Sequence, residues 1–404
     1  MRILQVIASI SERFGGPAQA VLDISKNLAD RGHAVDLFAT NTNANANHHH
    51  DHLQNDQYRI QLFACEWSPR NFFYAPSFQK ELAQTIHDYD LVHIHGLWVY
   101  PTLVASALCL KERIPYIVRP CGMLDAYCLR HHPIRKMVYS LIFERRNLAG
   151  ASAIHFTSEE ERKRSILFGA STQTVVLPLG IDSTAYLNLP PKGSFKKCYP
   201  NLTGKKIVLF LGRLCFKKGL DLLVSSFSEI VKTQRDCQLV IAGPDEEGYG
   251  KKLARLIRHL ELEEMVTFVG FVHGEEKRAL LRDSDLFCLP SHQENFAIAA
   301  VEAMAAGLPV VVSDQVGLHS DIQASGSGVV TQCRVRDLTS ALLLLLMNDE
   351  KRIKMGQNAR RFALEKYRWD LNISDYINFY DAVVAGKSRF EYLESSTVET
   401  KTTW

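Results

Sequence analysis

The sequence predicts an α/β protein built from two doubly wound halves, and three features support this. Short apolar runs alternate with helix-length amphipathic segments along most of the chain, which is typical of parallel sheets covered by helices. A polar stretch with Pro190, Pro191, Gly193, Pro200 and Gly204 interrupts the alternation once. The length of 404 residues also exceeds that of one ordinary domain. We therefore expect two domains that face each other across a cleft.

The expected boundaries follow from this interruption. We place the first domain at 1–185, the linker at 186–205 and the second domain at 206–369. We expect a last helix, at about 370–390, to pack back on the first domain. The expected strands are Arg2–Ala8, Ala34–Ala39, Arg59–Phe63, Leu91–His95, Tyr116–Arg119, Ala153–Thr157, Thr174–Leu177, Lys206–Leu211, Gln238–Ala242, Val266–Val269, Leu286–Pro290 and Pro309–Ser313. The expected helices are Ala18–Arg31, Leu103–Arg113, four that begin near Gly219, Tyr249, Gly274 and Phe296, and Val335–Met347, Glu350–Lys366 and Leu371–Val384.

The composition excludes several classes of protein. A hydrophobic fraction of 46% and a charged fraction of 23% are ordinary for a packed globular chain. The net charge of +3 is too small to indicate nucleic-acid binding. The nine cysteines contain no CxxC pair, which argues against a zinc site and a disulfide framework. No apolar run is long enough for a signal peptide or a membrane span, so we expect a cytoplasmic protein.

The strongest candidate site is the segment that contains Glu294 and Glu302. A loop carries Glu294, and a helix is expected to run from near Phe296 to Gly307. The free N–H groups at the helix start form an anion site suited to a diphosphate. If the whole segment were helical, the two carboxylates would lie about 12 Å apart along the axis. That span suits a sugar at one end of a diphosphate and a ribose at the other. The alternative is an ordinary helix with two exposed glutamates.

Two further features point to phosphate. Arg213 and Lys218 follow the first strand of the second half, at the sheet end where ligands of such folds bind. Their charges could neutralise a leaving diphosphate, although they could also be solvated loop cations. The Gly15-Gly16-Pro17 loop follows the first strand of the chain and permits a close approach of backbone to phosphate. A plain turn explains that loop equally well.

Together these features resemble the retaining glycosyltransferase family 4, which has the GT-B fold of two Rossmann-like domains. The resemblance covers most of the chain. It implies that Glu294 holds the donor sugar hydroxyls and Glu302 the ribose hydroxyls. The family usually has a glycine at the position of Ala297 in this sequence. The residues implied to bind the diphosphate are Arg213 and Lys218, with the backbone of Gly16, Asn295, Phe296, Ala297 and Ile298.

A second stretch, Tyr116 to Asp125, resembles a subgroup common among bacterial exopolysaccharide enzymes. Cys121 stands where the subgroup usually has an arginine and where many other members have a histidine. We therefore consider Arg119 as a source of charge near the reacting sugar, and His95 as a residue that lines the acceptor pocket. The alternative for His95 is a structural role at a strand end. Cys121 is a poor candidate for a nucleophile, since no base partner is evident.

The function implied by the resemblance is transfer of a hexose from a nucleotide diphosphate sugar, with UDP-glucose as the default donor. The acceptor would be a glycan or a lipid-linked saccharide in bacterial polysaccharide biosynthesis. We expect no cofactor and no metal, because Asp283-Ser284-Asp285 falls where the family has a structural aspartate and the cations and helix dipole can take the metal's role. The alternatives are a nucleotide-sugar epimerase and a non-catalytic sugar-nucleotide-binding protein.

The acceptor side is expected in the first half. An aromatic stretch, Trp67 to Tyr74, and a segment from Arg130 to Arg146 that mixes cations with apolar residues are the candidates. The second segment could rest on an anionic membrane, or it could be an amphipathic helix that covers the sheet. The run from His48 to His52 is expected to be a surface loop and not a metal site.

Overall fold

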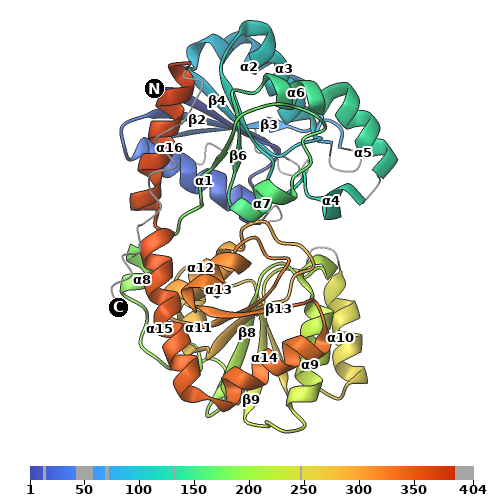
Figure 1. Ribbon diagram of the computed structural model, residues 1–404, viewed down its shortest axis with the longest axis vertical. Coiled ribbons are helices and arrows are strands. Elements are labelled where there is room, and N and C mark those ends of the chain that lie inside the picture. Colours follow the sequence, from blue (N-terminus) through green and yellow to red (C-terminus); the bar gives the residue numbers. More distant parts are fainter. Residues whose placement is uncertain (12–14, 42–57, 69–71, 131–132, 246–247, 387–404) are drawn as a thin grey trace.

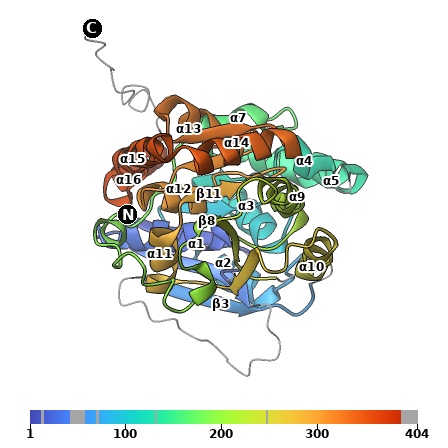
Figure 2. The ribbon, with the colours of Figure 1, turned by 90° about the horizontal axis from the view of Figure 1, so that it is seen from below.

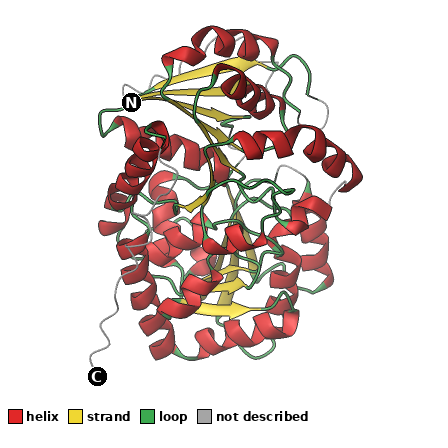
Figure 3. Ribbon diagram, turned by 45° about the horizontal axis from the view of Figure 1, so that its top comes forward, coloured by secondary structure: helices red, strands yellow, loops and turns green. Residues whose placement is uncertain are grey.

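The computed structural model describes residues 1–11, 15–41, 58–68, 72–130, 133–245 and 248–386. It contains two parallel sheets, one in each half, and both have helices on either side (Figures 1 and 3). The two doubly wound α/β halves expected from the sequence are therefore confirmed. The run from His48 to His52 lies outside the described residues.

The first sheet has seven strands in the order β3-β2-β1-β4-β5-β6-β7, and the second has six in the order β10-β9-β8-β11-β12-β13. In each sheet the order reverses beside the first strand, between β1 and β4 and between β8 and β11. Ligands of open α/β sheets bind at such switch points. The strands are β1 Arg2–Ile7, β2 Ala34–Asn41, β3 Arg59–Ala64, β4 Leu91–His95, β5 Tyr116–Arg119, β6 Ala153–Phe156, β7 Thr174–Val176, β8 Lys206–Leu211, β9 Cys237–Ala242, β10 Val266–Gly270, β11 Leu286–Leu289, β12 Val310–Ser313 and β13 Gly328–Thr331.

The helices fall between the strands, as the alternation of patterns predicts. In the first half they are α1 Gly16–Ala29, α2 Pro76–Thr85, η3 Ile86–Asp88, α3 Tyr100–Glu112, α4 Ala126–Arg130, α5 Pro133–Tyr139, η4 Ser140–Glu144, α6 Arg145–Gly150 and α7 Glu159–Arg164. After β7 they are α8 Thr184–Leu187, η5 Pro200–Leu202, η6 Phe216–Lys218, α9 Leu220–Ile230, α10 Tyr249–His259, α11 Gly274–Asp283, α12 Ile298–Ala305, α13 His319–Ser325, α14 Val335–Met347, α15 Asp349–Lys366 and α16 Trp369–Val384.

The central strands of each sheet are buried on both faces, which explains their near-continuous apolar sequences. All residues of β11 and β12 are buried, for example. Strand β13 was not expected from the sequence, because it is a short edge strand whose first three residues are only partly buried.

The last two helices run along both halves of the molecule. Helix α15 lies beside the lower half in Figure 1, and α16 continues beside the upper half. Helix α16 is tied to the first sheet by two tyrosines: the hydroxyl of Tyr380 bonds His93 Nδ1 at 2.6 Å, and the hydroxyl of Tyr376 donates to the carbonyl of Leu177 at 3.3 Å. Helix α16, which follows α15 of the second half, is thus attached to the first half.

The segment between the two sheets is held by aspartates that precede β11. The Asp283 carboxylate accepts hydrogen bonds from the backbone N–H groups of Phe195, at 2.8 Å, and Lys196, at 3.1 Å. Asp285 accepts one from the N–H of Ile207 at 2.8 Å. Both carboxylates therefore have structural partners that account for their positions. Among the described helices, none is long and apolar enough to cross a bilayer.

Candidate active site between the two sheets

The centre of the candidate site is an ion pair between Lys218 and Glu294. Lys218 ends the turn after β8, and Glu294 lies in the loop after β11, so the pair spans the switch point of the second sheet. The two side chains are only 17% and 16% exposed. Burial alone would raise the pKa of Glu294, but the charges of Lys218, Lys217 and Arg213 outweigh it and hold this pKa below its usual value. Glu294 is therefore an ionised carboxylate, with three cations close enough to act on it.

A glycine makes this approach possible. Gly219 follows Lys218 with φ of +69°, and a Cβ there would lie 2.1 Å from the carbonyl oxygen of Pro290. Only glycine allows the loop after β8 to lie against the end of β11 in this way. The local sequence thus places the ammonium of Lys218 beside the loop that holds Glu294.

Arg213 lies where the two halves meet. A Cβ on Gly15, at the start of α1, would lie 3.2 Å from Arg213 Nε, and Gly15 itself has φ of +59°. The glycine loop after β1 and the cation after β8 therefore face each other, each at the switch point of its own sheet. Among the described residues, no atom would lie within 4 Å of a Cβ on Gly16.

Glu302 lies at the same interface but has a different cation. Its carboxylate pairs with Lys277 Nζ at 2.6 Å, and its side chain is 15% exposed. Burial raises the pKa of Tyr186, and the charge of Glu302 together with a hydrogen bond to it adds to that rise. The pKa of Asp23 on α1 is raised to about 6, mainly by burial and also by the charge of Glu302. Glu302 therefore faces the first helix of the first half.

The helix that carries Glu302 starts later than the sequence suggested. It begins at Ile298 and not near Phe296, because Ala297 has a left-handed backbone, with φ of 64° and ψ of 57°. Glu294 therefore lies outside the helix, where its backbone forms an isolated parallel β-bridge with Val316. The estimate of its separation from Glu302 along one continuous helix does not apply. The left-handed backbone also explains a glycine preference at position 297, since an L-residue there costs about 1–2 kcal/mol.

The residues next to Glu294 contact the first half. The side-chain amide of Asn295 donates to Thr157 Oγ1 at 3.2 Å. A Cβ on Gly122 would lie 3.1 Å from Gln293 Nε2 and 3.2 Å from Asn295 Cβ. The Gly122 loop after β5 is thus packed on the Glu294 loop. No local sequence pattern marks Gln293 or Thr157 as a contact residue, because these contacts form only where the two halves meet.

The remaining expected residues, Arg119 and His95, are both only 1% exposed. Arg119 Nη2 donates to the carbonyl of Pro17 at 3.3 Å, and this hydrogen bond holds the end of the glycine loop in place. His95 Nε2 bonds Gln5 Oε1 at 2.6 Å, and burial keeps its pKa well below the usual value. The ring is enclosed in this structure, and its expected role in lining the acceptor pocket stays a prediction. The structural alternative describes His95 better.

Cys121 has no activating surroundings. Burial raises the pKa of its thiol, although the charge of Arg119 acts in the opposite direction. The thiol donates to the carbonyl of Arg119 at 3.4 Å. A nucleophilic thiolate is disfavoured here, in agreement with the interpretation from the sequence.

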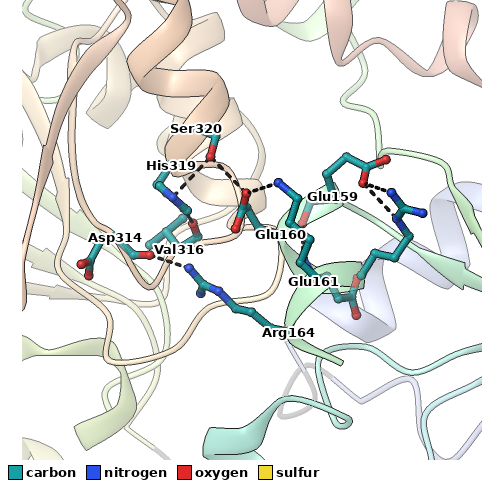
Figure 4. A network of polar contacts seen from close by, with 11 residues as sticks. Glu159, Glu160, Glu161, Arg164, Asp314, Val316, His319 and Ser320 are labelled. Carbon is teal, nitrogen blue, oxygen red and sulfur yellow. Dashed lines mark hydrogen bonds and ion pairs between the residues drawn. The ribbon is translucent and has the colours of Figure 1, made fainter. Parts of the chain in front are cut away.

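A second set of contacts joins the halves through α7 (Figure 4). Arg164 donates to the backbone carbonyls of Asp314, at 2.7 Å, and Gln315, at 3.2 Å. Glu160 accepts from Ser320 Oγ at 3.3 Å. The sequence of α7, EEERKR, is typical of a solvated helix, so its role between the halves could not be recognised without the structure.

Two family models match the chain, one in each half. The model "Glycosyl transferase 4-like domain" matches residues 15–180, and "Glycosyl transferases group 1" matches residues 194–362. The matched regions contain Gly16 in the first case and Arg213, Lys218, Glu294 and Glu302 in the second. Every residue that the sequence singled out for the site therefore lies inside a matched region.

Similar proteins extend over nearly the whole length. An uncharacterised glycosyltransferase of Methanocaldococcus jannaschii is 27% identical over 91% of this chain and 94% of its own. D-inositol 3-phosphate glycosyltransferase of Kineococcus radiotolerans is 25% identical over 93% and 92%. Among solved structures, Anabaena HepE in complex with UDP and glucose has a TM-score of 0.76 and 21% identity, over 95% of this chain and 100% of its own. The fold is GT-B, and the chain is a glycosyltransferase that joins a glycosyl transferase 4-like domain to a group 1 glycosyl transferase domain.

Proposed function

We propose that the chain is a retaining hexosyltransferase that uses a nucleotide diphosphate sugar, with UDP-glucose as the default donor. The acceptor is a glycan or lipid-linked saccharide of bacterial polysaccharide biosynthesis. The observation that carries the proposal is the partly buried Lys218–Glu294 pair, with Arg213 beside it and the Gly15–Gly16 loop opposite. Anionic and hydroxyl-rich groups are the ligands that such a mixture of cations, carboxylate and free backbone recognises.

Each group has a task in this proposal. Arg213, Lys218 and the N–H groups that open α12 bind the diphosphate, whose negative charge grows as it leaves. Glu294 accepts hydrogen bonds from hydroxyls of the donor sugar, and Glu302 from those of the ribose. A bound diphosphate would compete with Glu294 for the ammonium of Lys218, so the ion pair marks a cation already placed for phosphate.

The transfer itself exchanges one bond for another. The acceptor oxygen bonds to the anomeric carbon on the face from which the diphosphate departs, and the bond from that carbon to the phosphate oxygen breaks. The acceptor proton passes to the departing phosphate. The anomeric configuration is therefore kept, without a covalent enzyme intermediate.

The names of similar proteins include two different donors, and the first of them is the donor proposed here. HepE has been solved with UDP-glucose, whereas a relative from Mycobacterium tuberculosis, 28% identical over 58% of this chain, is named as a GDP-mannose-dependent mannosyltransferase. A thermal-shift panel of UDP and GDP sugars tests the donor. Stabilisation by UDP-glucose above that by GDP-mannose is expected, and the reverse order would replace UDP-glucose as donor.

Turnover separates the proposal from its alternatives. With donor alone, a transferase gives at most slow hydrolysis, whereas an epimerase converts the sugar. With donor and a saccharide acceptor, a transferase forms a product whose anomeric configuration is read from its proton coupling by NMR. Donor binding without turnover on any acceptor would favour the non-catalytic binding protein.

A further inference from the structure

The helical segment from Pro133 to Gly150 (α5, η4 and α6) has its polar and apolar faces reversed relative to an ordinary surface helix. Its fully buried positions are Ser140, Glu144, Asn147 and Leu148. The hydroxyl of Ser140 accepts from Trp98 Nε1 at 3.1 Å, and the Glu144 carboxylate accepts from the backbone N–H of Trp98 at 2.8 Å. Hydrogen bonds to two polar side chains, together with the buried Leu148, therefore hold this segment on the first half.

The outward face is apolar instead. We call its six exposed side chains the apolar ridge, and their exposed fractions run from 40% for Phe143 to 74% for Ile134. Spacings of three and four residues place most of them on one side of the helix. An apolar surface of this kind is costly to leave in water and usually marks an interaction site. The ridge consists of Ile134, Met137, Val138, Leu141, Ile142 and Phe143.

Only positive charge accompanies the ridge. Arg135, Arg145 and Arg146 are exposed along the same segment, and among the described residues none of them forms an ion pair. The single carboxylate in residues 126–150 is Glu144, which is buried. A segment that exposes arginines and no carboxylate is complementary to an anionic surface.

We propose that the apolar ridge docks the protein on an anionic lipid bilayer. The apolar side chains enter the boundary between headgroups and acyl chains, and the arginines pair with lipid phosphates. Figures 1 and 2 show α5 at the margin of the molecule in both views, where a flat surface can reach it.

The ridge leads directly to the candidate active site. Lys136 of α5 is turned inward and donates to the carbonyl of Cys128. Cys128 Sγ in turn lies 3.9 Å from Gln293 Oε1, and Gln293 precedes Glu294. A docked molecule therefore holds the edge of its cleft near the bilayer. This step rests on the proposed function, and it selects a lipid-linked saccharide as the acceptor.

Helix α10 provides an internal control. It also exposes several cations, including Lys251 and Arg255, but its apolar residues Leu253 and Ile257 are buried. If positive charge alone caused binding, α10 would serve as well as the ridge segment. If the ridge is required, changes on α10 leave binding intact.

The test is flotation of the full chain with phosphatidylcholine vesicles, with and without phosphatidylglycerol. Wild type is expected to float with the phosphatidylglycerol vesicles. The exposed double variants Leu141→Ser/Ile142→Ser and Arg135→Gln/Arg145→Gln should each lower the partition coefficient about tenfold or more. Lys251→Gln/Arg255→Gln should match wild type.

The failure of this inference is distinguishable from failure of the proposed function, because flotation needs neither donor nor turnover. The stabilisation of the protein by UDP-glucose is measured on the same variants and should be unchanged. Absence of wild-type binding to phosphatidylglycerol vesicles overturns the inference, and so does an equal loss in the α10 control. A dimer that dissociates in the Leu141→Ser/Ile142→Ser variant, without vesicle binding by wild type, would assign the ridge to a second copy of the chain.

Discussion

The two halves of the molecule present different kinds of surface to each other where they meet. On the side of the second half, the Lys218–Glu294 and Lys277–Glu302 pairs keep between 15% and 26% of each side chain exposed. On the side of the first half, Arg119 is 1% exposed, and the backbone of Gly15 lies against the side chain of Arg213. Among the described residues, the two ion pairs proposed to bind the donor therefore belong to the second half, while the first half contributes a close backbone approach at Gly15.

The largest effect is expected from removing the charge of Glu294. Glu294→Gln keeps the size of the side chain but weakens its hydrogen bonds to sugar hydroxyls, so kcat/KM should fall by about 10³-fold or more. The measurement is the steady-state rate with saturating acceptor. The matched control is Glu229→Gln on α9, which breaks an exposed ion pair with Lys232, two residues after the end of that helix. An equal loss of kcat/KM in both variants would contradict a specific role of Glu294 in the reaction.

Removal of Arg213 should have the next largest effect. Arg213→Ala takes away one cation from the developing charge of the diphosphate, and kcat is expected to fall by about 10²–10³-fold. Lys232→Ala, at an exposed position, should leave kcat unchanged. Activity of Arg213→Ala near that of wild type would show that the cation facing Gly15 does not contact the leaving group.

For a buried residue of the first half, we expect a substitution to lower the stability of the protein and to leave kcat nearly unchanged. His95→Leu leaves the buried oxygen of Gln5 without its partner, at a cost of about 1–3 kcal/mol in the free energy of unfolding. We expect kcat of the folded variant to change little, because the ring is enclosed. Urea unfolding and rate measurements on the same preparation check this. A large loss of kcat at unchanged stability would restore His95 as a functional residue.

The interface near Glu302 gives a pH-dependent prediction. The pKa of Asp23 is raised to about 6 in the folded protein, so the folded state binds this proton more tightly than the unfolded chain. That contribution to stability is complete below the ordinary value of 3.8 and is lost as the pH rises through about 6. Asp23→Asn should therefore have a Tm about 2–4 °C above wild type at neutral pH, with the two curves converging in acid. A constant difference at all pH values would rule out titration of Asp23 as the cause.

The smallest effect is expected at Ala297. Replacing it with glycine removes the strain that a Cβ causes in a left-handed backbone. Ala297→Gly should therefore stabilise the protein by about 1 kcal/mol. Equilibrium unfolding in urea measures this change. Ala300→Gly, inside α12, is the matched control and should destabilise by about 1 kcal/mol. Destabilisation by both changes would mean that the start of α12 is not strained.

The fold could be predicted from the sequence because its signals are local. Three strands, Leu91–His95, Tyr116–Arg119 and Lys206–Leu211, have the expected bounds, since buried parallel strands appear as unbroken apolar runs. The edge strand Gly328–Thr331 has little apolar length and was missed. The start of α12 was misplaced by two residues, because nothing local marks Ala297 as left-handed.

The candidate site could be predicted only in part, for a different reason. Arg213, Lys218 and Glu294 could be found because they follow the strands at the switch point, and the structure brings them together. The burial of His95 and Arg119 could not be predicted from the sequence, since a position at the end of a strand does not decide whether the side chain points into the core. The exposed ridge was ambiguous, because an apolar helix face covers a sheet far more often than it faces outward.

The central claim is that the second half's cleft face recognises both parts of a sugar nucleotide, and calorimetric titration tests it most directly. UDP and UDP-glucose are titrated into wild type, Glu294→Gln and Arg213→Ala. The account predicts that Arg213→Ala weakens both ligands, whereas Glu294→Gln keeps the affinity for UDP and loses only the extra affinity that glucose adds. If both variants bind both ligands as wild type does, the cleft between the two sheets is not the donor site.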